Sequence, residues 1–104
     1  MRVVFVNPPE IPGHLSDRDK AGGLGTLFPM RRRHGAVVPP LDLLYSAAVC
    51  DGLGADVQVV DAPADRMDLE AVARHVAFAD PDLFGIRLSL PSLTQDLALA
   101  RRLC

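Results

Sequence analysis

The chain has 104 residues, of which 49% are apolar and 23% are charged, and its net charge is −2. This length suits one small domain, the apolar content excludes a disordered chain, and the lack of a basic excess argues against nucleic acid as a partner. With two cysteines and no Cys-x-x-x-Cys-x-x-Cys motif, the chain cannot by itself hold a disulfide framework, a zinc site or a three-cysteine iron–sulfur cluster.

The first expected element is a buried strand. The run from Arg2 to Val6 is β-branched and aromatic, and Asn7, Pro8 and Pro9 end it. The run is too short for a membrane span or for the apolar region of a signal peptide. We therefore expect a cytoplasmic location and no membrane contact.

A long loop is expected next, from Glu10 to Val38, because glycines and prolines recur there and no helical or strand period survives. Strand-to-helix connections usually have about 2–6 residues. A loop of this length predicts a ligand over the carboxyl ends of the strands. The cluster Arg31 to His34 is either a solvated segment or a clamp for a phosphate or a neighbouring domain. His14 is either a surface residue or a ligand.

Helices and strands alternate in the rest of the chain. We expect a helix at 41–52, a strand at 56–60, a helix at 69–79, a strand at 83–90 and a last helix from 93. The apolar face expected for the first helix is Leu41, Leu44, Tyr45, Ala48 and Val49. The face expected for the last helix includes Leu97, Ala100 and Cys104. Asp68 is expected to cap the middle helix.

This order predicts an α/β domain of the three-layer Rossmann-like (flavodoxin-like) class with a parallel sheet of strand order 2-1-3. The switch point, where such folds bind ligands, would lie between the first and third strands. The third strand would be an exposed edge. We therefore expect residues 1–104 to be one domain, truncated before strands 4 and 5. The alternative is that another chain covers the edge.

Catalytic motifs are absent from the sequence. No serine lies in a Gly-x-Ser-x-Gly context, and the glycines at 22–25 do not continue into a nucleotide-binding motif. Asp61, at the end of the second strand, fits either an acid that holds a ribose hydroxyl or a turn-forming residue before Pro63. His75 is expected to be a surface or boundary histidine.

Four motifs in order resemble the N-terminal cobalamin-binding domain of B12-dependent radical SAM enzymes. They are Val6 to Pro9, Pro39 to Ala48, Val57 to Ala62, and Pro81 to Ile86. The resemblance implies a cobalamin-binding module without catalytic residues or metal ligands of its own. It further implies a radical SAM domain, downstream or in trans, that holds S-adenosylmethionine and an iron–sulfur cluster. Together they would form a methyltransferase-type enzyme.

The resemblance also implies which residues face the corrinoid. They are Asn7, Pro8, Pro9, Pro40, Leu41, Leu44, Asp61, Arg87, Leu88, Ser89 and Ser92. Asp42 stands where the family usually has glycine, and Arg87 where it has serine, so Ser89 or Ser92 is expected to supply the lost hydroxyl. Related carriers have an axial histidine where this chain has Asp19, so binding without a histidine on the lower face is expected.

Two other functions are alternatives. The charges of Asp42 and Arg87 fit a degenerate or truncated Rossmann domain that serves as an interaction module without a cofactor. A small nucleotide-binding enzyme is the third hypothesis, but Pro39 and Pro40 remove two N–H donors from the helix terminus that would bind a phosphate.

Overall fold

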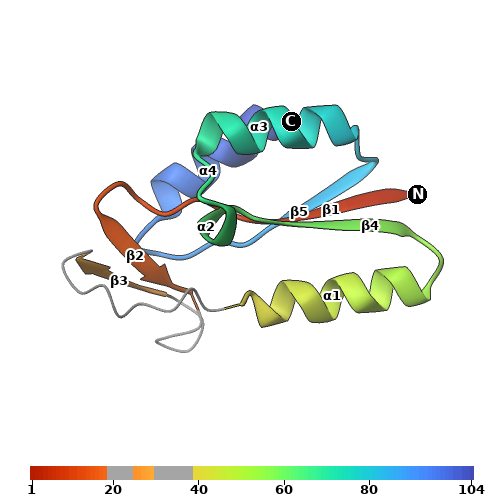
Figure 1. Ribbon diagram of the computed structural model, residues 1–104, viewed down its shortest axis with the longest axis horizontal. Coiled ribbons are helices and arrows are strands. Elements are labelled where there is room, and N and C mark those ends of the chain that lie inside the picture. The colour runs from red at the N-terminus through yellow and green to blue at the C-terminus, as the bar shows by residue number, and fades with distance from the viewer. Residues whose placement is uncertain (19–24, 30–38) are drawn as a thin grey trace.

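The computed structural model describes residues 1–18, 25–29 and 39–104. Its elements are β1 (Arg2–Asn7), β2 (His14–Asp17), β3 (Thr26–Pro29), α1 (Leu41–Gly52), β4 (Asp56–Asp61), α2 (Ala62–Asp65), α3 (Leu69–Ala79), β5 (Leu83–Ile86) and α4 (Leu93–Leu103), as labelled in Figure 1.

A three-stranded parallel sheet forms the centre of the fold. Its strand order is β4-β1-β5, which is the 2-1-3 order that the sequence predicts. On the central strand β1, Val4 and Val6 are fully buried. A β-branched run buried on both faces is typical of such a strand. The Rossmann-like α/β prediction is therefore confirmed for this sheet.

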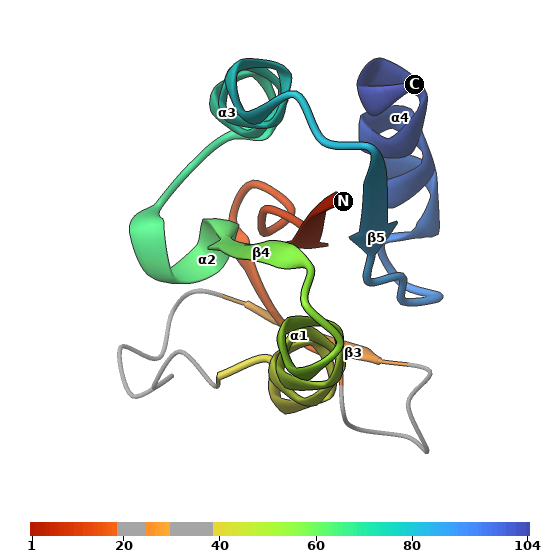
Figure 2. The same ribbon diagram turned by 90° about the vertical axis from the view of Figure 1, so that its right-hand side faces the viewer.

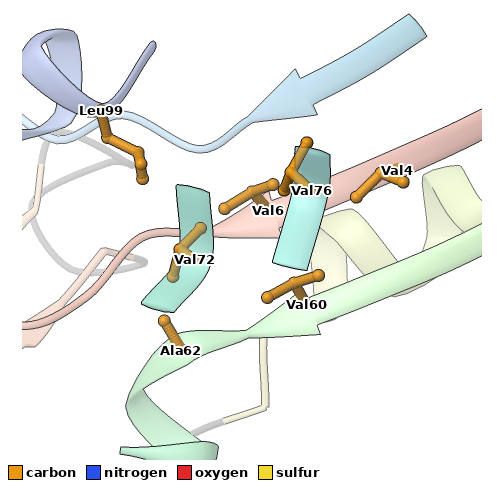
Figure 3. Close-up of a cluster of buried hydrophobic side chains, with 7 residues drawn as sticks. All are labelled: Val4, Val6, Val60, Ala62, Val72, Val76 and Leu99. Carbon is orange, nitrogen blue, oxygen red and sulfur yellow. The ribbon is translucent and has the colours of Figure 1, made fainter. Parts of the chain in front are cut away.

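Helices cover both faces of the sheet, with α3 and α4 on one side and α1 on the other (Figure 2). The core beneath α3 and α4 consists of Val4, Val6, Val60, Ala62, Val72, Val76 and Leu99 (Figure 3). Asp68 caps α3 as predicted, because its Oδ1 accepts a hydrogen bond of 2.8 Å from the Ala71 N–H.

The predicted apolar face of α1 is wrong. Leu43 and Ala47 are buried instead, and Tyr45 and Val49 are exposed by 72% and 63%. Apolar residues lie on nearly every side of this helix, so more than one apolar stripe runs along it. Periodicity alone could not decide which stripe faces the sheet.

The predicted apolar face of α4 is wrong as well. Leu97 is 40% exposed and Cys104 is exposed, and the buried residues of this helix are Leu99 and Asp96. The prediction followed the spacing of apolar residues, and that spacing cannot reveal that the side of the helix with Asp96 is buried.

The segment predicted to be loop contains an antiparallel hairpin, in which β2 pairs with β3. Short strands outside the main sheet leave too little alternation for a sequence pattern to reveal them. The strand predicted over 83–90 ends at Ile86, and the short helix α2 follows β4. The predictions for Asp19, for the glycines at 22–24 and for Arg31 to His34 lie outside the described residues.

Two further expectations concern the surface. The strand β5 is an edge of the sheet, as predicted, and its Leu83 is 55% exposed. Among the described helices, none is long and apolar enough to span a membrane.

Candidate functional site

The carboxyl ends of β1 and β5 lie side by side, as the predicted switch point requires. Val6 is in register with Ile86, and the Arg87 N–H donates a hydrogen bond of 3.1 Å to the Val6 carbonyl. Figure 1 shows the β2–β3 hairpin at the end of the sheet toward which both strands run. Open α/β sheets bind their ligands at this place.

The two residues that depart from the family pattern form an ion pair at the switch point. The Nε of Arg87 lies 2.9 Å from Oδ1 and 3.0 Å from Oδ2 of Asp42. The Arg87 side chain is 9% exposed and that of Asp42 is 58% exposed. The pair joins the first turn of α1 to the segment after β5. Because each residue carries the other's counter-charge, neither departure adds a net charge to the rim.

A buried polar cluster surrounds Asp96 on α4. Arg18 binds the Asp96 carboxylate with two bonds, Nη1 to Oδ2 at 2.6 Å and Nη2 to Oδ1 at 3.0 Å. The two side chains are 3% and 0% exposed. A bidentate geometry of this kind gives a strong charge-assisted contact and supplies each buried charge with its counter-charge.

Two serines complete the coordination of Asp96. Its Oδ2 accepts bonds from the Ser89 N–H at 3.1 Å and from the Ser92 hydroxyl at 2.8 Å. The two hydroxyls also hydrogen-bond each other, and Nη1 of Arg18 donates to Ser89 at 3.3 Å. The cluster therefore ties the end of the β2 strand to the turn between β5 and α4.

Close backbone packing strengthens this tie. Gly25 has φ +90°, and a Cβ on it would lie 2.5 Å from the Ser89 Cβ, so only glycine fits there. On the other side, the Gln95 side-chain amide donates to the carbonyls of Pro9 and Glu10, at 3.1 and 3.2 Å. Glu10, Arg18 and Gly25 of the long segment thus approach the start of α4 or the turn that precedes it.

The predicted corrinoid-facing residues divide into three groups by exposure. Asn7, Pro8, Pro9, Pro40, Ser89 and Ser92 are buried. Leu41, Leu44 and Leu88 are exposed by 52%, 41% and 44%. Asp61 and Arg87 are half-buried. Of this set, the three leucines have the most side-chain surface to offer a ligand.

Asn7 links the rim to β4. Its Nδ2 donates to Asp61 Oδ1 at 2.9 Å, where the two strands are in register. Its Oδ1 is buried and has no hydrogen-bond partner among the described residues. The sequence-based prediction that Asp61 lies at the ligand-binding edge is consistent with its position, but its carboxylate contacts an amide of this chain.

Sequence reasoning missed Arg18, Gly25, Gln95 and Asp96. The available signal was the Ser-x-x-x-Asp spacing of Ser92 and Asp96, which places both side chains on one side of the first turn of α4. Nothing in the sequence identifies Arg18 as their partner, because it lies 78 positions before Asp96.

Other candidate ligands do not gather at the rim. Within the described residues, no three His, Cys, Asp or Glu side chains form a group that could hold a metal ion. The Nδ1 of His14 lies 3.2 Å from the Pro12 carbonyl, and His75 is exposed on α3.

Comparisons with protein-family models, with curated proteins and with solved structures find no match to this chain. The cobalamin-domain resemblance therefore depends on the four motifs alone, and the functional argument depends on the site.

Proposed function

We propose that this domain is the cobalamin-binding module of a B12-dependent radical SAM enzyme and binds the corrinoid at the switch point between β1 and β5. The observation that carries the proposal is the ion pair of Asp42 with Arg87. Unpaired, these two charges would disfavour the binding of a largely apolar corrin at this rim. Paired with each other, they leave the neighbouring surface free to be apolar.

The exposed leucines fit the chemistry of the ligand. A corrin is a broad, largely apolar disc fringed with amides, which needs apolar contact area and a few polar groups. Leu41 and Leu44 in the first turn of α1, and Leu88 and Leu90 in the segment after β5, are exposed by 41–60%. Asp61 and the Arg87–Asp42 pair are the polar groups available to the amide fringe.

The buried cluster would hold this rim in place. Arg18, Ser89, Ser92 and Asp96 fix the turn after β5 with hydrogen bonds that do not depend on a ligand. A binding surface built on such a pre-organised support loses less free energy to ordering when the ligand binds.

The catalytic chemistry would come from outside this chain. Bound cobalamin supplies a cobalt centre that carries a methyl group, and the radical SAM domain, downstream or in trans, supplies the iron–sulfur cluster and S-adenosylmethionine. The residues of this chain bind and orient the corrinoid and limit the access of water.

A second candidate is an interaction module without a cofactor. The burial of Pro8, Pro9, Ser89 and Ser92 favours it, because these side chains have no surface to offer a ligand in this conformation. On this alternative, the exposed leucines contact a protein.

A titration of the chain with hydroxocobalamin, followed by visible absorption, separates the two candidates. The corrinoid proposal predicts a saturable, protein-dependent spectral shift. Leu88→Asp should weaken binding at least about fivefold, because covering its exposed part contributes about 1 kcal/mol. Phe78→Asp, on the 93% exposed Phe78 of α3, is the matched control and should bind like the wild type. No shift at about 100 μM protein would favour the interaction module.

A further inference from the structure

The carboxylate of Asp61 lies at the carboxyl end of β4 without a counter-charge. Asp61 is the last residue of β4 and is in register with Asn7, the last residue of β1. Its Oδ1 accepts a hydrogen bond of 2.9 Å from the side-chain amide of Asn7, which is neutral. In the described part of the chain, no basic side chain forms a salt bridge with Asp61. This half-buried negative charge is therefore left for a ligand to meet.

The pair of Asn7 and Asp61 also has more hydrogen-bond acceptors than donors. Asn7 is 4% exposed, and its Oδ1 is buried without a hydrogen-bond partner among the described residues. Of the two carboxylate oxygens of Asp61, only Oδ1 is bonded within the same residues. An ionised carboxylate accepts hydrogen bonds at both oxygens and donates none. A ligand group at this place is therefore bound best if it donates N–H bonds.

Asn7 and Asp61 lie on the face of the sheet that α1 covers. Their neighbours Val6 and Val60 belong to the core beneath α3 and α4, and successive side chains of a strand point to opposite faces of the sheet. Figure 2 shows α3 and α4 on one face and α1 on the other. The Asn7–Asp61 pair is thus on the same face as the first turn of α1, which carries two of the exposed leucines.

The ion pair of Asp42 with Arg87 also presents an anion more than a cation. Arg87 lies at the carboxyl end of β1, because its N–H donates a hydrogen bond to the Val6 carbonyl. The Arg87 side chain is 9% exposed, whereas that of Asp42 is 58% exposed. Of the charged side chains that these contacts place at the ends of β1 and β4, the more accessible ones are therefore the carboxylates of Asp42 and Asp61.

We infer that Asp61 makes the site selective for corrinoids whose ring carries amide side chains, against corrinoids whose side chains are carboxylates. This inference rests on the proposed corrinoid function. A primary amide has two N–H groups to donate to the acceptors of Asp61 and Asn7. A carboxylate at the same place would donate nothing and would be repelled by the charge of Asp61, and such repulsion is one way in which a protein rejects a wrong ligand.

Equilibrium dialysis of the full chain against two corrinoids tests the inference. Cobinamide and cobyrinic acid share the corrin ring and the cobalt, but the first carries amide side chains and the second carboxylates. The wild type should bind cobinamide at least about tenfold more tightly, since one like-charge contact near a protein surface suffices for that ratio. Asp61→Asn keeps an oxygen for the Asn7 amide and offers the ligand an N–H in place of a charge, so it should reduce the preference at least about fivefold.

Asp56→Asn is the matched control. It removes the same charge from the opposite end of the same strand, where Asp56 is 77% exposed, and should change the preference by less than about twofold. Hydroxocobalamin, dialysed in parallel, tests the proposed function separately. If it binds and the wild type holds both test corrinoids equally, only the inference is overturned. Equal effects of Asp56→Asn and Asp61→Asn would also overturn it, because net charge would then explain the preference. If hydroxocobalamin does not bind, the proposed function fails and the inference falls with it.

Discussion

Removal of Arg18 is the substitution with the largest effect expected from the site geometry. The carboxylate of Asp96 is 0% exposed, and Arg18 supplies two of its hydrogen bonds and its only described counter-charge. Arg18→Met keeps much of the aliphatic volume but leaves the buried Asp96 carboxyl without its counter-charge. Breaking a buried pair in this way typically costs about 3–5 kcal/mol. Small domains are stable by only about 5–15 kcal/mol, so the variant should be close to its limit.

Urea unfolding followed by circular dichroism measures this cost. For a domain of this size an m-value of roughly 1–2 kcal/mol per molar urea is expected. The unfolding midpoint of Arg18→Met should therefore fall by about 2–3 M. The control is Arg102→Met, which breaks the exposed pair of Arg102 with Glu70. Such surface pairs contribute about 0–1 kcal/mol, so its midpoint should move by less than about 0.7 M.

The double variant Arg18→Met with Asp96→Leu separates charge from packing. If the loss in Arg18→Met comes from an uncompensated carboxylate, removal of that carboxylate should recover about half or more of the lost stability. The reasoning is refuted if Arg18→Met unfolds at the same urea concentration as the Arg102→Met control. It is also refuted if the double variant is less stable by the full sum of the two single effects.

Three further predictions follow from individual contacts. Gly25→Ala should destabilise the chain by about 1–3 kcal/mol in the same urea assay, because the added Cβ meets Ser89. The control Gly13→Ala, at a glycine with φ +80° and open space around it, should cost about 1 kcal/mol. Equal effects of the two substitutions would contradict the close approach of Gly25 to Ser89. Asp68→Ala should lower stability by about 1 kcal/mol, since it removes the cap of α3, and an unchanged thermal midpoint would count against it. Arg87→Ser leaves the carboxylate of Asp42 without this partner and should weaken hydroxocobalamin binding, while adding Asp42→Gly should restore it; a double variant no better than the single one would argue against mutual compensation.

The sequence was sufficient to predict the sheet because the signals involved are local. The apolar run of β1, the alternation of elements and the cap at Asp68 each depend on neighbouring residues. The right-handed crossover rule then restricts the strand order. The register of β1 with β4 and β5 confirms the sheet, and the hydrogen bond from the Ala71 N–H to Asp68 confirms the cap.

The orientation of two helices could not be predicted in the same way. The helix α1 is apolar on several sides, so its rotation is decided by packing on β1 and β4 and by the contact between Asp42 and Arg87. In α4 the buried residue is Asp96, whose burial depends on Arg18. A partner so far away in the chain has no local signature.

The position of the candidate site could be predicted from the sequence, but the contacts of its side chains could not. Topology indicates the switch point, and the motifs indicate the rim residues. Leu41 and Leu88 are exposed, whereas Arg87 is half-buried against Asp42, and Ser89 and Ser92 use their hydroxyls inside the protein. Their expected role as direct substitutes for the family's serine stays a prediction.

The most direct test of the corrinoid proposal is a two-dimensional ¹H–¹⁵N NMR titration of the full chain with hydroxocobalamin. Saturable shifts are expected for the amides of Leu41, Arg87 and Leu88 at the strand ends. The amide of Asp56, at the opposite end of the sheet, should not move. Shifts that fail to saturate, or that are no larger at the rim than at Asp56, would contradict a corrinoid site at the switch point.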